Sequence, residues 1–441
     1  MEKNNLFKAL LLSMVVIVSS CSKDSSSTDP VNPVLDCNGV ANGTSVADDC
    51  GVCQQAYTYN FITHVATLLD DTTGVSVDPA TTWIVMPGDA NSLVDPYWNM
   101  SCAYKFVRNG ASTVSYGGQT TRLNMADELV SSLKNGDRDL AGLQQMWETG
   151  TGFTTPDLDN DAKILRSKFS SGHTGSLTTV KDLMDNLLTT FDSEVLANWN
   201  SDASAGTGGE YTTASQGRTV HIDNLGREID QCFAKSLIGG LCFDQAMKYL
   251  TLDAVSNTNS DWATGNYAPA TSMEHKWDEG FGYVYGVDDN LTDANINGDI
   301  LLGKYVNKFD DIKANVWDAM KAGRAAISTN ANDDGADYSA RDAQATIIKA
   351  ELSKVIALKA IGYLRGAADA WDAEGGVSAD YFHDLSEGWG FIISLQYTDW
   401  FDNATCMSMI AELELGNGLW DRNSTELNAM ADAINAVANV E

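Results

Sequence analysis

The sequence has little positive charge. Of its 441 residues, 28 are Lys or Arg and 60 are Asp or Glu, which gives a formal net charge of −32 at pH 7. A chain with this balance repels phosphate groups, so the composition argues against nucleic acids as partners and against adhesion to anionic lipid surfaces. It favours solubility and the attraction of cations. A hydrophobic content of 44% with 9% aromatic residues is nevertheless typical of a globular protein.

Histidine is scarce as well, and the usual hydrolase signatures are missing. The chain holds five histidines and no His-Glu-x-x-His motif. No Ser/His/Asp or Cys/His set stands in a recognisable context. The glycine-rich stretch at 205–209 follows no predicted strand and lacks the Gly-Lys-Ser/Thr that a phosphate-binding loop requires. We therefore expect a protein without enzymatic activity.

Long hydrophobic runs are limited to the N-terminus. Lys3 and Lys8 precede a short apolar segment, 9–18, which ends in Val-Ser-Ser-Cys21 and resembles a bacterial lipobox. We expect a signal peptide at 1–21, lipidation of Cys21 and a flexible Ser-rich tether at 22–35. Because no second apolar segment of about 18 residues follows, the predicted membrane contact is a lipid anchor in the outer membrane, on its periplasmic or its outer face.

Cysteine is sparse outside one short module. Residues 36–53 read DCNGVANGTSVADDCGVC, a composition that cannot build an apolar core. The predicted module, 36–56, looks like the Cys/Asp/Gly-rich modules beside the anchors of some secreted bacterial proteins, where disulfides are expected before zinc. Seven cysteines remain if Cys21 is lipidated, so at least one is unpaired within the chain. Cys232 and Cys242 fall in one predicted helix, about 15 Å apart along its axis, which is too far for a disulfide.

Apolar residues recur at helical spacing from Thr121 onward. The clearest predicted helix is Ser176–Trp199, with Ser176 as its predicted N-cap. We expect irregular loops and a short hairpin at 57–118, and a loop at Ser201–Thr219. Further helices are expected at 272–285, 301–327, 341–372, 380–397, 404–415 and 424–439. The pattern predicts an all-α fold of two antiparallel helical bundle halves, 57–260 and 261–441.

Two predicted helices carry the same arrangement of potential ligands. His275 and Glu279 are separated by one helical turn, and so are His383 and Glu387. Glycines alternating with aromatic residues follow both pairs, and Gly282 lies on the same helix face as His275. If the two helices converge, two imidazoles and two carboxylates suit iron, zinc or manganese. The alternative is a pair of hydrogen-bonded His–Glu contacts that stabilise the bundle.

Acidic residues next to the first pair suggest a supporting role. Glu274 and Asp278 flank His275, and we expect them to orient the imidazoles around the metal.

A candidate calcium loop follows the predicted helix 272–285, but it matches its pattern only in part. Asp293, Asn295, Asn297 and Asp299 alternate as in the opening of an EF-hand loop. The twelfth position of that loop is Lys304, where a bidentate glutamate is needed. Calcium here is therefore a minor expectation beside a plain acidic turn.

Several ordered blocks resemble a known family. They are GGQTTRLNMADELVSSLKNGD at 117–137, MEHKWDEGFGYVYG at 273–286, GKYVNKFDD at 303–311, MKAGRAAI at 320–327 and HDLSEGWGFIISLQY at 383–397. Together they look like an uncharacterised family of exported bacterial lipoproteins, related more distantly to imelysins and to iron-regulated imelysin-like proteins. The resemblance covers 57–441 and leaves the Cys-rich module outside.

This resemblance implies an imelysin-like all-α fold with a ligand site between its halves, and a role in iron or haem acquisition. We expect the membrane, through the lipid anchor, and an outer-membrane receptor as partners. Imelysins carry a Gly-x-His-x-x-Glu motif that was read as a protease metal site. Here Met273 takes the place of the glycine and Asp278 that of the glutamate, with Glu279 one residue later. The expected function is thus binding of a metal ion or metal complex. The alternatives are an imelysin-like metallopeptidase and a non-catalytic scaffold or receptor-accessory lipoprotein.

Overall fold

The protein is mainly helical. The computed structural model describes residues 35–41, 43, 45–47, 53–60, 65–69, 74–78, 81–85, 103–108, 111–262, 266–267, 269–287 and 300–441. Its α-helices are α1 (Gly117–Asn135), α2 (Leu140–Gln144), α3 (Leu165–Lys168), α4 (Thr178–Thr190), α5 (Ile229–Leu237), α6 (Asp244–Met247), α7 (Ala254–Ser256), α8 (Ser272–Tyr285), α9 (Leu301–Val306), α10 (Asp310–Thr329), α11 (Ser339–Glu374), α12 (Ala379–Leu395), α13 (Asn403–Leu413) and α14 (Ser424–Ala438). Within the described ranges, no helix combines the length and the hydrophobicity needed to cross a bilayer.

The strands form small antiparallel sheets. They are β1 (Val46–Ala47), β2 (Cys53–Gln54), β3 (Tyr57–Asn60), β4 (Val65–Leu68), β5 (Thr82–Val85), β6 (Val107–Arg108), β7 (Ala111–Ser112), β8 (Gly209–Thr213) and β9 (Arg218–Ile222). Strand β3 is central in a β4-β3-β5 sheet, whereas β1–β2, β6–β7 and β8–β9 are two-stranded. The region 57–118, expected to be loops with a short hairpin, therefore contains a three-stranded sheet and the β6–β7 hairpin.

Most predicted helices are confirmed within a few residues. Helix α8 has the predicted bounds, 272–285, whereas the predicted helix 301–327 is divided into α9 and α10. The division falls before α10, where Phe309 has an extended backbone with φ of −127° and ψ of 101°. Ser176 is not the N-cap of α4: the helix begins at Thr178, and Leu177 occupies the N-cap position without a side-chain cap.

The segment 201–219 was expected to be a loop, and this expectation is wrong for its second half. Strands β8 and β9 pair from Gly209 opposite Ile222 to Thr213 opposite Arg218. Gly217, with φ of +63°, takes the left-handed conformation in the turn between them. The Gly- and Thr-rich composition is typical of a loop, so it did not indicate this hairpin. In the second strand, RTVHI, buried and more exposed residues alternate.

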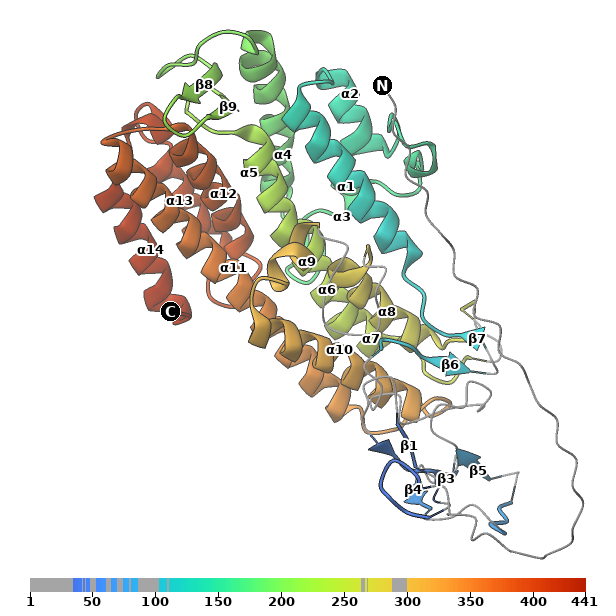
Figure 1. The fold of residues 1–441 in the computed structure, drawn as a ribbon. Coiled ribbons are helices and arrows are strands. Elements are labelled where there is room, and N and C mark those ends of the chain that lie inside the picture. The colour runs from blue at the N-terminus through green and yellow to red at the C-terminus, as the bar shows by residue number, and fades with distance from the viewer. Residues whose placement is uncertain are drawn as a thin grey trace, which may run out of the picture.

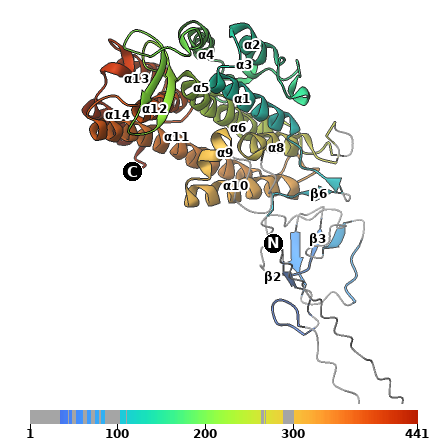
Figure 2. The same cartoon turned by 45° about the horizontal axis from the view of Figure 1, so that its top comes forward.

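The long apolar run after β9 forms the middle of the molecule. Helices α5, α6 and α7 follow one another through two π-helical segments, Ile238–Phe243 and Lys248–Asp253. In Figure 1 this green run lies between α1 on one side and the C-terminal helices on the other, and α5 packs against both α1 and α12. Figure 2 shows the long helix α11 crossing the molecule beside α10, α12 and α14, against which it packs.

One hydrophobic core joins these helices. It extends from Tyr104 to Ala438, so both predicted halves contribute to it. Cys232 and Cys242 lie in this core as free, fully buried thiols, and they form no disulfide with each other, as predicted from their separation. Cys406 is buried and free as well. The division of the helical domain at residue 260 stays a prediction.

A buried network of charged side chains fixes the start of α8. Glu274 receives two hydrogen bonds of 2.8 Å from the guanidinium of Arg108 and an ion pair of 2.9 Å from Arg324. Arg324, on α10, also donates from Nε to Asp278 Oδ1 at 2.8 Å, and Tyr104 donates to the same oxygen at 2.8 Å. All five residues are at most 3% exposed, so the network ties the segment before α1 to α8 and α10.

The electrostatics of this network depend on its arginines. Burial alone would raise the pKa of Glu274, but the charges of Arg324 and Arg108 outweigh that effect and hold the pKa far below its usual range. Burial raises the pKa of Asp278 to about 6 even though Arg324 and Tyr104 stabilise its charge. Removal of a shared cation therefore leaves carboxylates buried with too little compensation.

We predict that Arg324→Met destabilises the protein by about 3–5 kcal/mol, because breaking a buried ion pair strands its partner charge. The matched control is Arg365→Met. Arg365 pairs with Asp432 at 3.1 Å and with Glu441 at 2.8 Å, but its side chain is 35% exposed, and we expect a loss below about 1 kcal/mol. Urea unfolding of both variants measures the difference, and equal losses would contradict the importance of the buried network.

Candidate functional site

Helix α8 holds the first His–Glu pair in a position set by its N-cap. The Thr271 hydroxyl accepts a hydrogen bond from the backbone N–H of Glu274 at 3.0 Å, and the Glu274 carboxylate accepts one from the backbone N–H of Thr271 at 2.8 Å. This capping box fixes where the helix begins. Glu274 and Asp278 are thus bound to the helix start and to arginines, and no described hydrogen bond joins either of them to an imidazole.

His275 and Glu279 lie one turn apart, with His275 Nε2 3.9 Å from Glu279 Oε2. Glu279 is already held by Lys276, at 2.5 Å, and by the Gln119 amide, at 3.0 Å. The ring of Tyr267 stacks on the imidazole at 3.8 Å. Burial lowers the pKa of His275, Glu279 opposes that change, and the charges of Lys276 and Arg324 add to it.

The glycines after this pair serve helix packing. A Cβ on Gly282 would lie 2.6 Å from Tyr116 Cβ and 2.9 Å from Gln119 Cβ. Since these neighbours leave no space beside Gly282, the missing side chain permits close contact with α1 and does not make room for a ligand. In α12, a Cβ on Gly390 would likewise lie 2.5 Å from Lys235 Cβ on α5.

Helix α12 holds the second pair, and a residue from the start of α5 joins it. His383 Nδ1 lies 2.7 Å from a carboxylate oxygen of Glu228, to which it donates. His383 Nε2 faces Glu387 Oε2 at 3.9 Å. The backbone N–H of Glu228 donates to Ser386 Oγ at 2.8 Å, which fixes the start of α5 against α12. Because Nδ1 is engaged, Nε2 is the nitrogen left for a proton or a metal ion.

The turn before α5 positions Glu228. The Asp223 carboxylate accepts hydrogen bonds from the backbone N–H groups of Leu225 and Arg227 at 3.0 and 2.8 Å. Gly226 lies within this turn with φ of +82°, and a Cβ there would meet the Phe382 ring at 2.7 Å. This sharp turn, which requires glycine at position 226, therefore places the carboxylate of Glu228 next to His383.

The Glu387 carboxylate divides its contacts between its two oxygens. Lys235 on α5 pairs with Oε1 at 2.8 Å, and the Tyr305 hydroxyl lies 3.5 Å from the same oxygen. The hydroxyls of Tyr305 and Tyr363 lie 3.2 Å apart. Burial raises the pKa of Glu387, but Lys235 and His383 outweigh it, so the net shift is downward. Glu387 is therefore an anion whose Oε2 faces the imidazole.

Two further carboxyl groups are short of compensating charge. Burial raises the pKa of Asp384 to about 6, helped by Glu387 and opposed by His383. Burial and the charge of Glu228 together raise the pKa of Asp230 to about 7. His383 responds in the opposite direction: burial lowers its pKa, but the hydrogen bond and charge of Glu228 outweigh this and raise it. This part of the molecule favours an added positive charge, whether a proton or a metal ion.

His383, Asp384 and Glu387 are close enough together to share one metal ion. One potential ligand atom of each lies within 4.8 Å of the other two, and no other group of three His, Cys, Asp or Glu residues in the described part of the chain is as close. The four residues predicted to converge are therefore not brought together. His275 and Glu279 stay on α8 and His383 and Glu387 on α12, which lie apart in Figure 1.

Sequence reasoning missed Asp384, a member of this cluster, and Glu228, which contacts it through His383. Asp384 directly follows a predicted ligand, so its position beside His383 was a signal that could have been used. Glu228 lies 155 residues before His383, and nothing in its local sequence indicates that the fold brings the two side chains together.

The remaining predicted site residues lie outside the described part of the chain: Cys21, Asp293, Asn295, Asn297 and Asp299.

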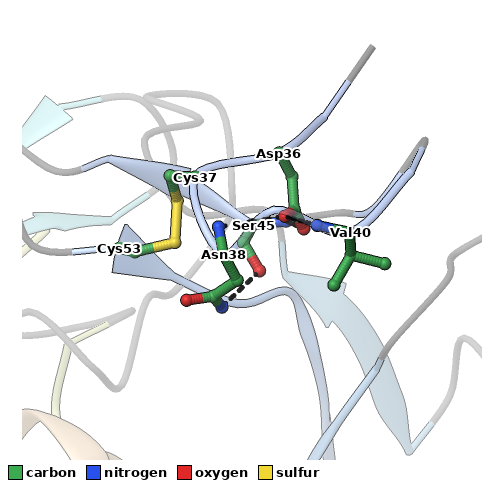
Figure 3. The surroundings of a disulfide bond; sticks show 6 residues. All are labelled: Asp36, Cys37, Asn38, Val40, Ser45 and Cys53. Carbon is green, nitrogen blue, oxygen red and sulfur yellow. Dashed lines mark hydrogen bonds between the residues drawn. A yellow bond between two sulfur atoms is a disulfide. The ribbon is translucent and has the colours of Figure 1, made fainter. Parts of the chain in front are cut away.

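The Cys-rich module is described in part. Its Cys37 and Cys53 form a disulfide (Figure 3). The Asp36 carboxylate accepts hydrogen bonds from the backbone N–H groups of Val40 at 2.8 Å and Ser45 at 3.1 Å, so it closes a turn.

We predict that Asp230→Asn stabilises the metal-free protein at neutral pH. The ordinary pKa of aspartate is near 3.9, and the folded value is about 7. The folded state therefore binds the extra proton between these values, and stability falls as the pH rises from about 4 to 7. The full shift corresponds to roughly 2–4 kcal/mol. Unfolding with chelator at pH 5 and pH 8 measures this slope, which the variant should flatten; an unchanged slope would contradict the assignment.

A comparison with known proteins gives one match. A family model described as "Domain of unknown function (DUF4856)" matches residues 101–439. No curated protein and no solved structure matches the chain. The match confirms the expectation of an uncharacterised domain family and makes no link to imelysins. Because the matched residues make up most of the sequence, the chain belongs to the DUF4856 family.

Proposed function

We propose that the chain is a lipid-anchored outer-membrane protein that binds a divalent transition-metal ion or a complex of one, in particular iron, through His383, Asp384 and Glu387. The observation that carries the proposal is the contact of Glu228 with His383 Nδ1 at 2.7 Å. A carboxylate on the outer nitrogen of an imidazole is the usual support of a metal-ligating histidine, since it fixes the tautomer and the ring orientation.

The donor set fits a transition metal. One imidazole nitrogen and two carboxylates are ligands that iron, manganese and zinc accept. Lys235 pairs with Oε1 of Glu387, and Oε2 of the same carboxylate faces Nε2 of His383 at 3.9 Å. A divalent ion among these groups would supply the charge that Asp384 lacks, with its pKa of about 6. Binding would release the proton from Nε2 of His383, so affinity should fall at acidic pH.

The wider role rests on the N-terminal signal and on the family resemblance. Cys21 would carry the lipid anchor, and an outer-membrane receptor would be the partner in iron or haem acquisition. A distant relation to imelysins, with two helical halves, remains part of this proposal. The lipid anchor would hold the metal site near the membrane, where an ion could be passed on.

A scaffold without a metal is the second candidate, and one observation favours it. Lys235 already pairs with Glu387 at 2.8 Å, so the cluster contains part of its own compensating charge. In that case His383 would serve only to pack α12 against the start of α5.

We predict that a stoichiometric transition metal binds the chelator-treated full-length chain and raises its melting temperature. A ligand at one hundred times its Kd stabilises the native state by about 2.7 kcal/mol. Fe(II), Fe(III), Mn, Zn and Ca are added singly, with metal content measured by mass spectrometry. His383→Gln should abolish the binding, and Glu228→Gln should weaken it by about 10–100-fold, as loss of an outer-shell partner does.

The matched control is His221→Gln. His221 is half-buried and stacks on Trp199 at 3.6 Å, outside any described metal cluster. Metal affinity should be the same in this variant as in the unaltered chain. Melting temperatures that no ion changes would reject the metal proposal in favour of the scaffold.

A further inference from the structure

Cations gather around one tyrosine in a chain that has few of them. The ring of Tyr249 has the ammonium groups of Lys168, Lys248 and Lys276 at 5.8, 5.6 and 5.5 Å from its centroid. Lys168 Nζ also lies 3.4 Å from the Tyr249 hydroxyl. The three lysines come from α3, the π-helical segment Lys248–Asp253 and α8. With 28 basic residues against 60 acidic ones in the whole chain, this concentration is unusual.

Arg122 on α1 belongs to the same cluster. Its charge and that of Lys248 add to the effect of burial in lowering the pKa of Lys168. A Cβ at Gly118 would lie 3.6 Å from Arg122 Nη1 and 3.2 Å from Lys163 Nζ, so a further ammonium group lies near the guanidinium. We call Arg122, Lys168, Lys248 and Lys276 the basic cluster.

Acidic partners compensate only part of this charge. Lys276 pairs with Glu279 at 2.5 Å and Lys248 with Asp253 at 3.7 Å. Within the described part of the chain, Arg122 and Lys168 have no ion pair. The basic cluster thus carries two cations more than it has paired carboxylates, which is a cost that a bound anion would remove.

Hydrogen-bond donors without partners lie beside these cations. The hydroxyl of Tyr283 is buried and has no hydrogen-bond partner, and the same holds for Nε of Arg122. Tyr283 is fully buried, and its ring stacks on that of Tyr249 with centroids 5.9 Å apart. Burial raises the pKa of Tyr283 and the charge of Arg122 opposes the rise, so the two side chains are within electrostatic reach. Buried donors are normally satisfied, and unpaired ones in a native protein need an explanation.

We propose that the basic cluster binds the phosphate group of a small molecule or a free phosphate ion. Lysine and arginine donate charge-assisted hydrogen bonds to phosphate oxygens, and arginine matches their geometry. The phenols of Tyr249 and Tyr283, whose pKa values are raised, stay protonated and are donors too. A multiply charged tetrahedral anion uses more such donors than a carboxylate does.

The proposal also accounts for the difference between the two His–Glu motifs. His275 and Glu279 have the same spacing and the same Gly-aromatic-Gly continuation as His383 and Glu387. Glu279 pairs with Lys276 of the basic cluster, and its charge acts on Lys168 as well. Around the second motif, the cations are Lys235, which pairs with Glu387, and Lys359. They are outnumbered by the carboxylates of Glu228, Asp230, Asp384 and Glu387. The first environment therefore favours an anion, and the second favours a cation.

Phosphate titration of the full-length chain by calorimetry tests the proposal. Chelator is present throughout, so that a metal at His383 cannot hold the phosphate, and sodium chloride at matched ionic strength is the reference. We expect saturable binding of inorganic phosphate that Lys168→Gln and Lys248→Gln each weaken about tenfold or more, since hydrogen bonds between charged groups are worth about 1.5–3 kcal/mol.

Two further variants separate charge from folding. Lys168→Arg keeps the charge and should restore most of the affinity. Lys354→Gln is the matched control, because Lys354 pairs with Glu351 on α11, has no described contact with a residue of the basic cluster, and has a side chain that is 43% exposed. Phosphate affinity in this variant should match that of the unaltered chain.

The outcomes distinguish specific phosphate binding from a general response to ionic strength. Equal heats with phosphate and with chloride, or equal losses in Lys354→Gln and Lys168→Gln, would overturn the proposal, because they would reflect a general response to ionic strength or net charge. Repetition with glycerol 1-phosphate distinguishes the sources: tighter binding than inorganic phosphate indicates a phosphorylated molecule, and weaker binding indicates the free ion. Either of these results supports the site.

Discussion

The ion pairs among Arg108, Arg324, Glu274 and Asp278 are the interaction on which the architecture depends most. Four charges removed from water are tolerable only because each is hydrogen-bonded within the network. They come from a hairpin strand, from α8 and from α10, so three distant parts of the sequence can satisfy one another only in the native arrangement. The carboxylates on this face of α8 therefore hold the fold together. This explains why they do not orient the imidazoles, as their spacing on the helix suggested.

Close helix contacts then decide what the two His–Glu motifs can do. Gly282 lets α8 approach α1 and Gly390 lets α12 approach α5, since a Cβ at either position would overlap its neighbour. The approach of α1 sets Gln119 beside Glu279. The approach of α5 sets Glu228 beside His383 and Lys235 beside Glu387. The glycines have the same structural use in both motifs. What differs is the set of side chains that the neighbouring helix contributes.

Local pattern was enough to predict most of the helical framework. The bounds of α8 were predicted correctly as 272–285, and the structure shows that a capping box of Thr271 and Glu274 fixes its start. The β8–β9 hairpin was not predicted, because a glycine- and threonine-rich sequence is typical of a loop. The strand pairing across the turn at Gly217 is visible only in the structure. The predicted helix 301–327 is interrupted near Phe309, where the sequence keeps its helical period but the backbone is extended. In both places, contacts or backbone conformations that periodicity does not encode decided the structure.

The candidate site could be predicted only halfway. His383 and Glu387 were identified because an i, i+4 pair is visible in the sequence, but Glu228 reaches His383 only through the turn at Gly226, and a one-dimensional pattern cannot show this. The charge of the surroundings was equally hidden. A net charge of −32 suggested attraction of cations everywhere, yet the folded chain concentrates several of its 28 basic residues around Tyr249 and leaves carboxylates in excess around His383. A repeated motif therefore does not imply a repeated function, because the neighbouring helices set the sign of the local potential. On this argument we propose an anion at the motif on α8 and a metal ion at the motif on α12.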